Sequence, residues 1–140
     1  MEENKIIETD GTHHLEFCRK LLEANPYIVY NRIEVASATP ESVEIYTDLR
    51  PEFTNIYGML HGGLMATMLD SCAGLTVRLD GKRYVTLDMN ISYLANVKEG
   101  RVTARSRVVR RGNNVTVMRV ELTGGDTLLA EATVTFYRIG

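Results

Sequence analysis

The segment Gly62–Arg78 (GGLMATMLDSCAGLTVR) restricts the possible folds most strongly, because apolar or small side chains occupy nearly every side of the helix that it predicts. Such a helix must be surrounded by protein, and this one is too short to cross a bilayer. The rest of the 140-residue chain, which is enough for one domain, must therefore provide the cover.

Most of the remaining chain predicts β-structure, in stretches rich in Val, Thr and Tyr that are separated by short turns. Short turns between long strands favour antiparallel pairing. The expected strands are Ile33–Ala38, Ser42–Leu49, Tyr84–Leu94, Arg101–Arg111, Asn114–Thr123 and Leu128–Ile139. Apolar residues at helical spacing predict a further helix over Thr12–Asn25. Residues 1–140 therefore form a single α+β domain, in which a curved antiparallel sheet of five or six strands wraps around one long buried helix, with an N-terminal helix.

Composition and charge exclude several classes of protein. The net charge of −2 argues against nucleic acid as a partner, and no stretch is apolar enough to span a membrane. The polar, acidic Met1–Asp10 does not resemble a signal peptide. Cys18 and Cys72 have no metal-binding or redox-motif spacing, so we expect no metal site and a cytoplasmic location.

Arginines are concentrated between positions 101 and 120, where the chain has six of them and no acidic residue. A local cationic strip suits a small anionic ligand. Solvated arginines on an exposed strand face would produce the same pattern, so both interpretations stay open.

Asp70 lies in the middle of the apolar helix. A carboxylate in such surroundings is costly unless partners satisfy it. It could be a structural group that is bonded to the backbone or to an arginine. It could equally be a catalytic base or nucleophile, because such carboxylates are typical of active sites.

His61-Gly62-Gly63 stands at the N-terminus of the same helix. The first N–H groups of a helix have no intrahelical acceptor and lie at the positive end of its dipole. Two glycines would let a carbonyl oxygen or an oxyanion approach these N–H groups closely. A tight turn into the helix would also require glycine.

Gly62 and Asp70 are eight residues apart, which corresponds to roughly 12 Å along a helix. A reacting carbonyl must lie within about 3 Å of both its oxyanion donors and its nucleophile or base. One chain cannot supply both groups, but two antiparallel helices related by a twofold axis can. The chemistry therefore predicts a homodimer with two equivalent sites, and a dimer of dimers (a homotetramer) is a further expectation.

Two other positions could belong to the site. Asn55 could hold a substrate carbonyl or position His61, or it could be a turn residue. Thr86 lies on an expected strand and could orient a water molecule. Apolar side chains occupy the alternate positions Val85, Leu87, Met89 and Ile91 of that strand. If these side chains face the buried helix, Thr86 points away from it. Alternatively, these side chains cover a further subunit interface.

The stretch Asn55–Gly63 (NIYGMLHGG), with Asp70 and Thr86–Leu94 (TLDMNISYL), resembles the hotdog-fold acyl-CoA thioesterases of the PaaI (phenylacetate-pathway) type. The resemblance runs from about Pro26 to the C-terminus and implies the hotdog fold.

The resemblance also implies roles for single residues. Asp70 would be the catalytic carboxylate, and the N–H of Gly62 would be the oxyanion donor. Asn55 and His61 would position the thioester, and Thr86 would take the place of a Ser or Thr that orients water.

Coenzyme A would lie along the segment matching Tyr93–Lys98 and the turn matching Arg110–Val115, near Arg138. Its phosphates would agree with the arginine strip. The residues assigned to coenzyme A are Tyr93, Leu94, Ala95, Asn96, Lys98, Arg110, Arg111, Gly112, Asn113 and Arg138. Many members of the family carry proline where this chain has Ala95-Asn96-Val97.

The sequence thus predicts an enzyme that hydrolyses an acyl-CoA thioester to a free acid and coenzyme A, with no cofactor because that thioester is the substrate. Asp70 would act as a general base or attack directly to give an anhydride. The alternatives are a hotdog dehydratase of β-hydroxyacyl thioesters and an acyl-CoA-binding or sensing module. We expect the acyl pocket to be lined across the subunit interface by residues of the buried helix and the N-terminal helix, with Met65, Met68, Leu69 and Tyr57 as candidates, which leaves aromatic and medium-chain acyl groups open.

Overall fold

The computed structural model describes residues 12–140, so the expectation for Met1–Asp10 lies outside the described residues. Two helices come first, α2 (Thr12–Glu23) and α3 (Pro26–Tyr30), and a long helix, α4 (Gly62–Val77), follows the second strand. Single 3-10 turns are found at η1 (Pro51–Phe53) and η2 (Arg78–Asp80). The strands are β1 (Glu34–Ala38), β2 (Ser42–Asp48), β3 (Tyr84–Tyr93), β4 (Arg101–Arg111), β5 (Val115–Gly124) and β6 (Thr127–Arg138).

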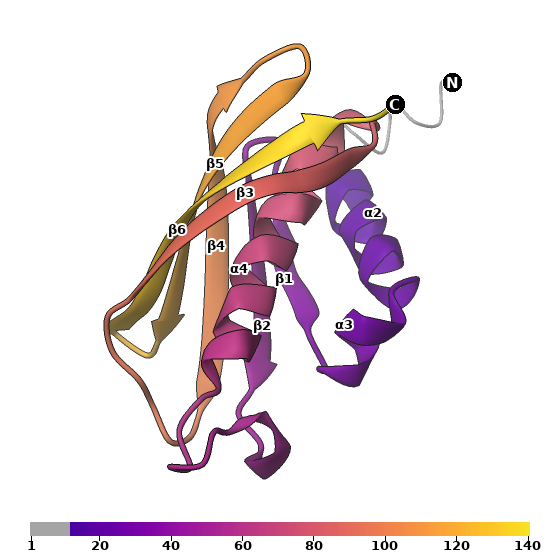
Figure 1. Cartoon of the computed structure of the whole chain (residues 1–140). Coiled ribbons are helices and arrows are strands. Elements are labelled where there is room, and N and C mark those ends of the chain that lie inside the picture. The colour runs from indigo at the N-terminus through magenta and orange to yellow at the C-terminus, as the bar shows by residue number, and fades with distance from the viewer. Residues whose placement is uncertain (1–11) are drawn as a thin grey trace.

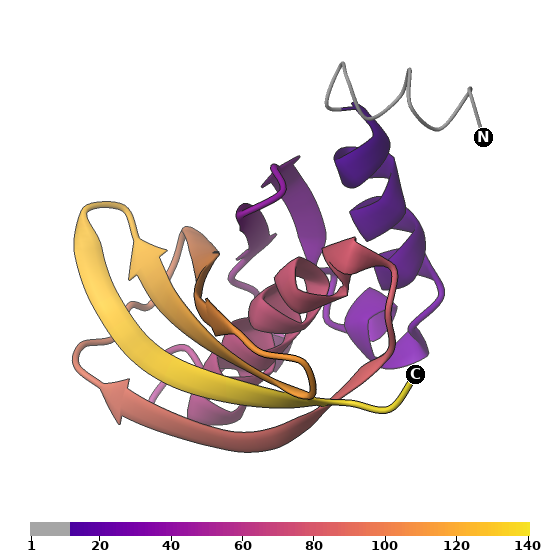
Figure 2. The same cartoon turned by 90° about the horizontal axis from the view of Figure 1, so that it is seen from above.

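The six strands form one antiparallel sheet in the order β1-β2-β4-β5-β6-β3. Figures 1 and 2 show that this sheet curves around α4, while α2 and α3 lie on the side of α4 that the sheet leaves open. The expected hotdog arrangement, a curved antiparallel sheet around one long helix, is confirmed.

The hydrophobic core lies between α4 and the concave face of the sheet. Ten of the 16 residues of α4 are buried, so the helix is covered on most sides as its composition predicts. The strands β2, β4, β5 and β6 bury alternate residues, since successive side chains of a strand point to opposite faces. Asp70 and Ser71 interrupt the buried surface of α4 and are half-buried.

The N-terminal region contains one helix more than the sequence predicts. Pro26 ends the first helix as expected, but it also begins α3, in which it occupies the first turn. Proline is favoured there because its fixed φ angle suits a helix and the first N–H has no intrahelical acceptor. The apolar side chain of Ile28 anchors this short helix in the core.

The strand β3 forms one edge of the sheet and pairs only with β6 among the described strands. Its side chains Val85 and Leu87 are 46% and 60% exposed, which is unusual for large apolar residues on an edge strand. No helix within residues 12–140 is long and apolar enough to cross a membrane.

Candidate active site

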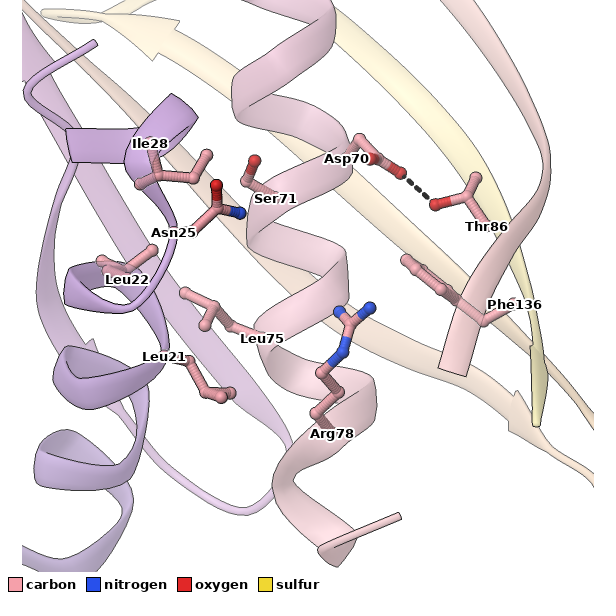
Figure 3. A pocket seen from close by; sticks show the side chains of 10 residues that line it. All are labelled: Leu21, Leu22, Asn25, Ile28, Asp70, Ser71, Leu75, Arg78, Thr86 and Phe136. Carbon is pink, nitrogen blue, oxygen red and sulfur yellow. Dashed lines mark hydrogen bonds between the residues drawn. The ribbon is translucent and has the colours of Figure 1, made fainter. Parts of the chain in front are cut away.

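Asp70 and Thr86 meet between α4 and β3. The hydroxyl of Thr86 donates a hydrogen bond of 2.7 Å to Oδ1 of Asp70. Figure 3 shows the two side chains pointing toward each other across the gap between helix and strand. Thr86 therefore binds one oxygen of the carboxylate, Oδ1, and does not bind the other, Oδ2.

A β-bulge in β3 explains why Thr86 faces the helix. The pairing with β6 matches Thr86 to Phe136 and then Asp88 to Thr135, so Leu87 is an extra residue without an opposite partner. Paired residues on adjacent strands project to the same face, and Phe136 is buried against the core. After the bulge the alternation is shifted by one residue, so Met89 also faces the core, opposite the buried Val134.

The bulge resolves the conflict that strict alternation raises. The apolar positions of β3 do not form one face: Val85 and Leu87 are exposed, whereas Met89 and Ile91 pack against the core. Thr86 and the later apolar residues can therefore both face α4.

A cavity of about 270 Å³ lies beside Asp70, between α4, the helices α2 and α3, and the end of β6. Leu21, Leu22, Ile28, Leu75 and Phe136 supply its apolar walls. Its polar lining consists of Asn25, Asp70, Ser71, Arg78 and Thr86. A carboxylate at the wall of a cavity with both apolar and polar lining is an arrangement in which a bound group can be held next to a reacting side chain.

Arg78 is a site residue that the sequence interpretation missed. It follows the last residue of α4 directly, yet its guanidinium turns back toward Asp70 and Phe136 (Figure 3). Burial lowers its pKa, and the charge of Asp70 partly opposes that shift. The available signal was a charged residue at the end of an otherwise apolar helix.

Within the single chain, the four residues expected to line the acyl pocket do not line this cavity, and their place in a pocket across an interface stays a prediction. Met65, Met68 and Leu69 are buried in the core between α4 and the sheet, and Tyr57 is 72% exposed on the loop before the helix. Helical spacing could not separate the residues of α4 that face the sheet from those that face α2.

At the N-terminus of α4, His61 is the N-cap residue. Its Nδ1 accepts a hydrogen bond of 2.8 Å from the N–H of Gly63, so the imidazole hydrogen resides on Nε2. The N–H of Gly62, the first residue of the helix, has no intrahelical acceptor. The side chain of His61 therefore occupies one backbone donor and leaves the neighbouring one to another acceptor.

The two glycines differ in what they make possible. A Cβ on Gly63 would lie 2.9 Å from Nδ1 of His61, so this glycine is required by the histidine cap. A Cβ on Gly62 would meet only the ring of Tyr93, at an ordinary contact distance of 3.6 Å. The packing of the single chain therefore does not explain glycine at position 62, whereas close approach of a ligand would.

Asn55 organises the loop that leads to α4. Its Oδ1 accepts hydrogen bonds from the N–H groups of Tyr57, at 2.9 Å, and Met59, at 3.1 Å. The side-chain oxygen of Asn55 therefore stabilises the turn, which is one of the two roles expected for this residue. Its amide nitrogen has no hydrogen-bond partner among residues 12–140, so the same side chain keeps a donor for a substrate oxygen.

Tyr93 and the segment after it lie beside the N-terminal end of α4. The hydroxyl of Tyr93 donates to the carbonyl of Gly62 at 3.3 Å, and Nδ2 of Asn96 donates to the carbonyl of Leu60 at 3.1 Å. The backbone amides of Leu94 and Ala95 both bond to the carbonyl of Leu129. The first predicted coenzyme A segment is therefore brought to the predicted oxyanion donor, with Lys98 exposed just beyond it.

The second predicted coenzyme A segment lies at the opposite end of α4. Arg111 bonds to the carbonyl of Val77 and forms an ion pair of 2.9 Å with Asp80. Arg138 is joined to the same turn, because its N–H donates to the carbonyl of Asn114. Arg110, Gly112 and Asn113 complete this turn, and Gly112 is needed there because a Cβ would lie 2.6 Å from the carbonyl oxygen of Val115. Within one chain, the two segments are separated by the length of α4.

Most of the arginine strip is neutralised by neighbouring carboxylates. Four of its six arginines are paired: Arg101 with Asp48, Arg105 with Glu44, Arg111 with Asp80 and Arg119 with Glu131. Within residues 12–140, Arg107 and Arg110 have no ion-pair partner. The strip is therefore mainly a charge-paired strand surface, to which Arg110 and Arg138 add cationic charge near one turn.

Comparisons with known proteins identify the family to which the chain belongs. Residues 57–131, which include α4 and β3, match the thioesterase superfamily. Human acyl-coenzyme A thioesterase 13 is 32% identical over 102 residues, which cover 71% of this chain and 73% of the human protein. The crystal structure of a thioesterase from Haemophilus influenzae is similar with a TM-score of 0.83, at 25% identity and over 90% of both chains.

The PaaI protein from the phenylacetic acid degradation operon of Escherichia coli is similar in fold, with a TM-score of 0.87 at 17% identity over 93% of this chain and 96% of PaaI. More than half of the chain matches the family, and the matched part carries Asp70, Thr86 and the helix that begins at Gly62. The chain belongs to the thioesterase superfamily, a family of thioester hydrolases.

Proposed function

We propose that the protein hydrolyses acyl-CoA thioesters, with Asp70 of one chain acting on a carbonyl held by Gly62 of a second chain. The observation that carries this proposal is the hydrogen bond from Thr86 to Asp70 at the wall of the cavity. This hydrogen bond orients one oxygen of Asp70, a carboxylate for which the apolar surroundings on α4 provide no other explanation. Similarity to acyl-coenzyme A thioesterases supports coenzyme A as the carrier of the thioester.

The distribution of site residues along α4 supports a second chain in the site. Gly62 and Asp70 are on one straight helix, roughly 12 Å apart along its axis, and a single carbonyl cannot reach both. The two coenzyme A segments are separated in the same way, at opposite ends of α4. Antiparallel packing of two such helices about a twofold axis would reunite both pairs at once.

The exposed edge of β3 suits this assembly. An edge strand with exposed apolar side chains such as Val85 and Leu87 can pair with the same strand of a second copy. Such pairing would extend the sheet across the twofold axis and bury these side chains. It would also place the two α4 helices side by side, as the shared site requires.

The hydrolysis would then proceed as follows. The thioester carbonyl oxygen accepts a hydrogen bond from the N–H of Gly62, at the positive end of the helix dipole. Oδ2 of the partner's Asp70 either takes a proton from a water molecule or attacks the carbonyl carbon itself, because Oδ1 is occupied by Thr86. In the first path, the lone pairs of the Thr86 hydroxyl accept a hydrogen bond from the same water.

In either path the carbon–sulfur bond breaks and coenzyme A leaves as the thiolate, which then gains a proton. Attack by water gives the free acid directly. Attack by Asp70 gives an anhydride, which water hydrolyses to the free acid and the original carboxylate. Both paths use the same residues. Incorporation of oxygen from labelled water into Asp70 during a single turnover would establish the anhydride path with attack of water on the carbonyl carbon of Asp70, because the general-base path labels only the free acid.

The test is the substitution Asp70→Asn, assayed by release of free thiol from a panel of acyl-CoAs. We expect the wild-type protein to hydrolyse at least one of them and kcat of D70N to fall by at least about 1000-fold, since no other group replaces the carboxylate. The control is Asp126→Asn in the exposed turn between β5 and β6, which should keep full activity. Full activity of folded D70N would overturn the proposal.

A further inference from the structure

Within residues 12–140, four arginines have partly buried side chains and therefore need compensation for their charge: Arg78, Arg111, Arg119 and Arg138. Arg111 is paired with Asp80 and Arg119 with Glu131, each at 2.9 Å. Arg78 has no ion pair with any carboxylate within residues 12–140, although burial affects its pKa more than any neighbouring charge does. Arg138 has no ion pair within these residues either, but of the four only Arg78 lines the cavity.

The guanidinium of Arg78 is held in place by the backbone. Nη1 donates to the carbonyl of Gly74 at 2.8 Å, and Nη2 donates to the carbonyl of Tyr84 at 2.7 Å. A Cβ on Gly74 would lie 2.5 Å from Nη1, so the absence of a side chain there makes room for the guanidinium. Two of the five N–H groups are used in this way, which leaves three for another acceptor.

Five apolar side chains line the cavity beside Asn25, Ser71 and Thr86 and are available to contact a short apolar chain. In Figure 3 the guanidinium of Arg78 lies below Asp70 and beside Phe136, whereas Leu21, Leu22 and Ile28 come from the side of α2 and α3. The Arg78 side chain turns back to Gly74, which lies four residues, or about 6 Å along the helix, beyond Asp70. An acyl group that starts at Asp70 would reach the guanidinium over this distance.

We propose that Arg78 binds a carboxylate at the far end of the acyl group, so that the substrates are coenzyme A monothioesters of short dicarboxylic acids. A carboxylate accepts two parallel hydrogen bonds from a guanidinium, which neither an alkyl end nor a single hydroxyl can do. Asp70 acts on Arg78 through its charge without forming an ion pair with it, so the substrate carboxylate would supply the direct partner that Asp80 and Glu131 supply to Arg111 and Arg119. This inference rests on the proposed thioesterase function and specifies its substrate class.

A purely structural role for Arg78 predicts a different outcome. In that case, its bonds to Gly74 and Tyr84 would only connect the end of α4 to the start of β3. Loss of the side chain would then impair all acyl-CoAs to the same extent. The ratio of kcat/KM for two substrates of equal length separates the two roles, because a general structural defect cancels from it.

The experiment compares adipoyl-CoA with hexanoyl-CoA, which have the same chain length and differ in the terminal carboxylate. The wild-type protein should prefer adipoyl-CoA in kcat/KM by about 10- to 100-fold, the usual effect of hydrogen bonds to a charged group. Arg78→Met should lower this ratio by at least about 10-fold, and Arg78→Lys, which keeps the charge without the fork, should have an intermediate ratio. The control is Arg107→Met on the outer face of β4, which should leave the ratio unchanged.

Each outcome decides for or against the inference. A wild-type preference for hexanoyl-CoA, or the same ratio in wild type and folded R78M, would overturn it while the thioesterase function stands. If R78M does not fold, the wild-type ratio alone decides. If the wild type hydrolyses no acyl-CoA at all, the proposed function fails first, and tighter binding of adipoyl-CoA than of hexanoyl-CoA to D70N, measured by calorimetry, still tests the role of Arg78.

Discussion

The two halves of α4 carry different chemistry. The first half begins at the exposed N-cap His61 and offers backbone N–H groups with no side chain at Gly62. The second half carries side-chain chemistry, with the carboxylate of Asp70, the buried thiol of Cys72 and, at its end, the guanidinium of Arg78. The two halves lie apart along the helix axis, so under the proposed mechanism one chain would offer both parts of a site without assembling them.

The largest effect is expected from variants that test whether Gly62 and Asp70 act from different chains. Gly62→Ala and Asp70→Asn should each be nearly inactive as pure homodimers, because each damages both sites of the dimer. Mixing the two variants after unfolding and refolding should restore about a quarter of wild-type activity, since half of the dimers are mixed and each mixed dimer has one intact site. Thiol release measured against the mixing ratio checks this, and no recovery would place both groups in the same chain.

The second prediction separates the two glycines of the first half. Gly62→Ala should lower kcat by about 100-fold or more through loss of close approach to an oxyanion donor, with little change in stability. Gly63→Ala should instead lower the stability of the fold by about 1 kcal/mol, because its Cβ displaces the His61 side chain from the N-cap. Activity assays together with thermal unfolding of both variants make the comparison. Equal stability losses would show that glycine serves the same purpose at both positions.

The third prediction concerns Thr86 in its contact with the second half. Thr86→Val keeps the shape of the side chain and removes the hydroxyl that donates to Asp70. We expect kcat to fall by about 10- to 100-fold and KM to change little, since an orienting hydrogen bond to a charged group is lost. Steady-state kinetics with one acyl-CoA check this. Thr103→Val, at a half-buried position on β4, is the control for the same change elsewhere.

The smallest effect at neutral pH is expected from the buried thiols. Burial raises the pKa of Cys72 to about 12, and that of Cys18 likewise to about 12, from an ordinary value of 9.0. Between these values the unfolded chain loses the thiol protons and the native protein keeps them. The native state then binds more protons than the unfolded state, so the free energy of unfolding falls as pH rises from about 9 toward 12. Below this range, the thiols add no pH dependence to the free energy of unfolding.

Urea unfolding at pH 8, 9 and 10 measures this decline, with Cys72→Ala expected to have a smaller slope against pH than wild type. Native protein at pH 8 should also react with a thiol reagent only as fast as it unfolds. Rapid modification of Cys72 in the native state would show that the second half of α4 is open to solvent.

Local sequence patterns were sufficient for the long helix α4, for α2 and for the six strands, but not for α3. The apolar and small residues of 62–77 indicated a helix that must be covered, and all six strands were expected within one or two residues of their observed ends. The spacing of Gly62 and Asp70 also follows from the sequence, because the rise of a helix per residue is constant. The missed helix, α3, has only five residues, too few for a periodic pattern to be recognised.

The tertiary structure decided which of these residues face one another. The extra residue Leu87 shifts the alternation of β3 and turns Thr86 toward Asp70, and a bulge of one residue leaves no signal in a pattern that assumes strict alternation. The position of Arg78 in the cavity and the pairing of Arg111 with Asp80 depend on contacts between segments far apart in the chain. Periodicity reports how each segment is buried, whereas the partner of a side chain depends on strand order and register, which local sequence does not specify.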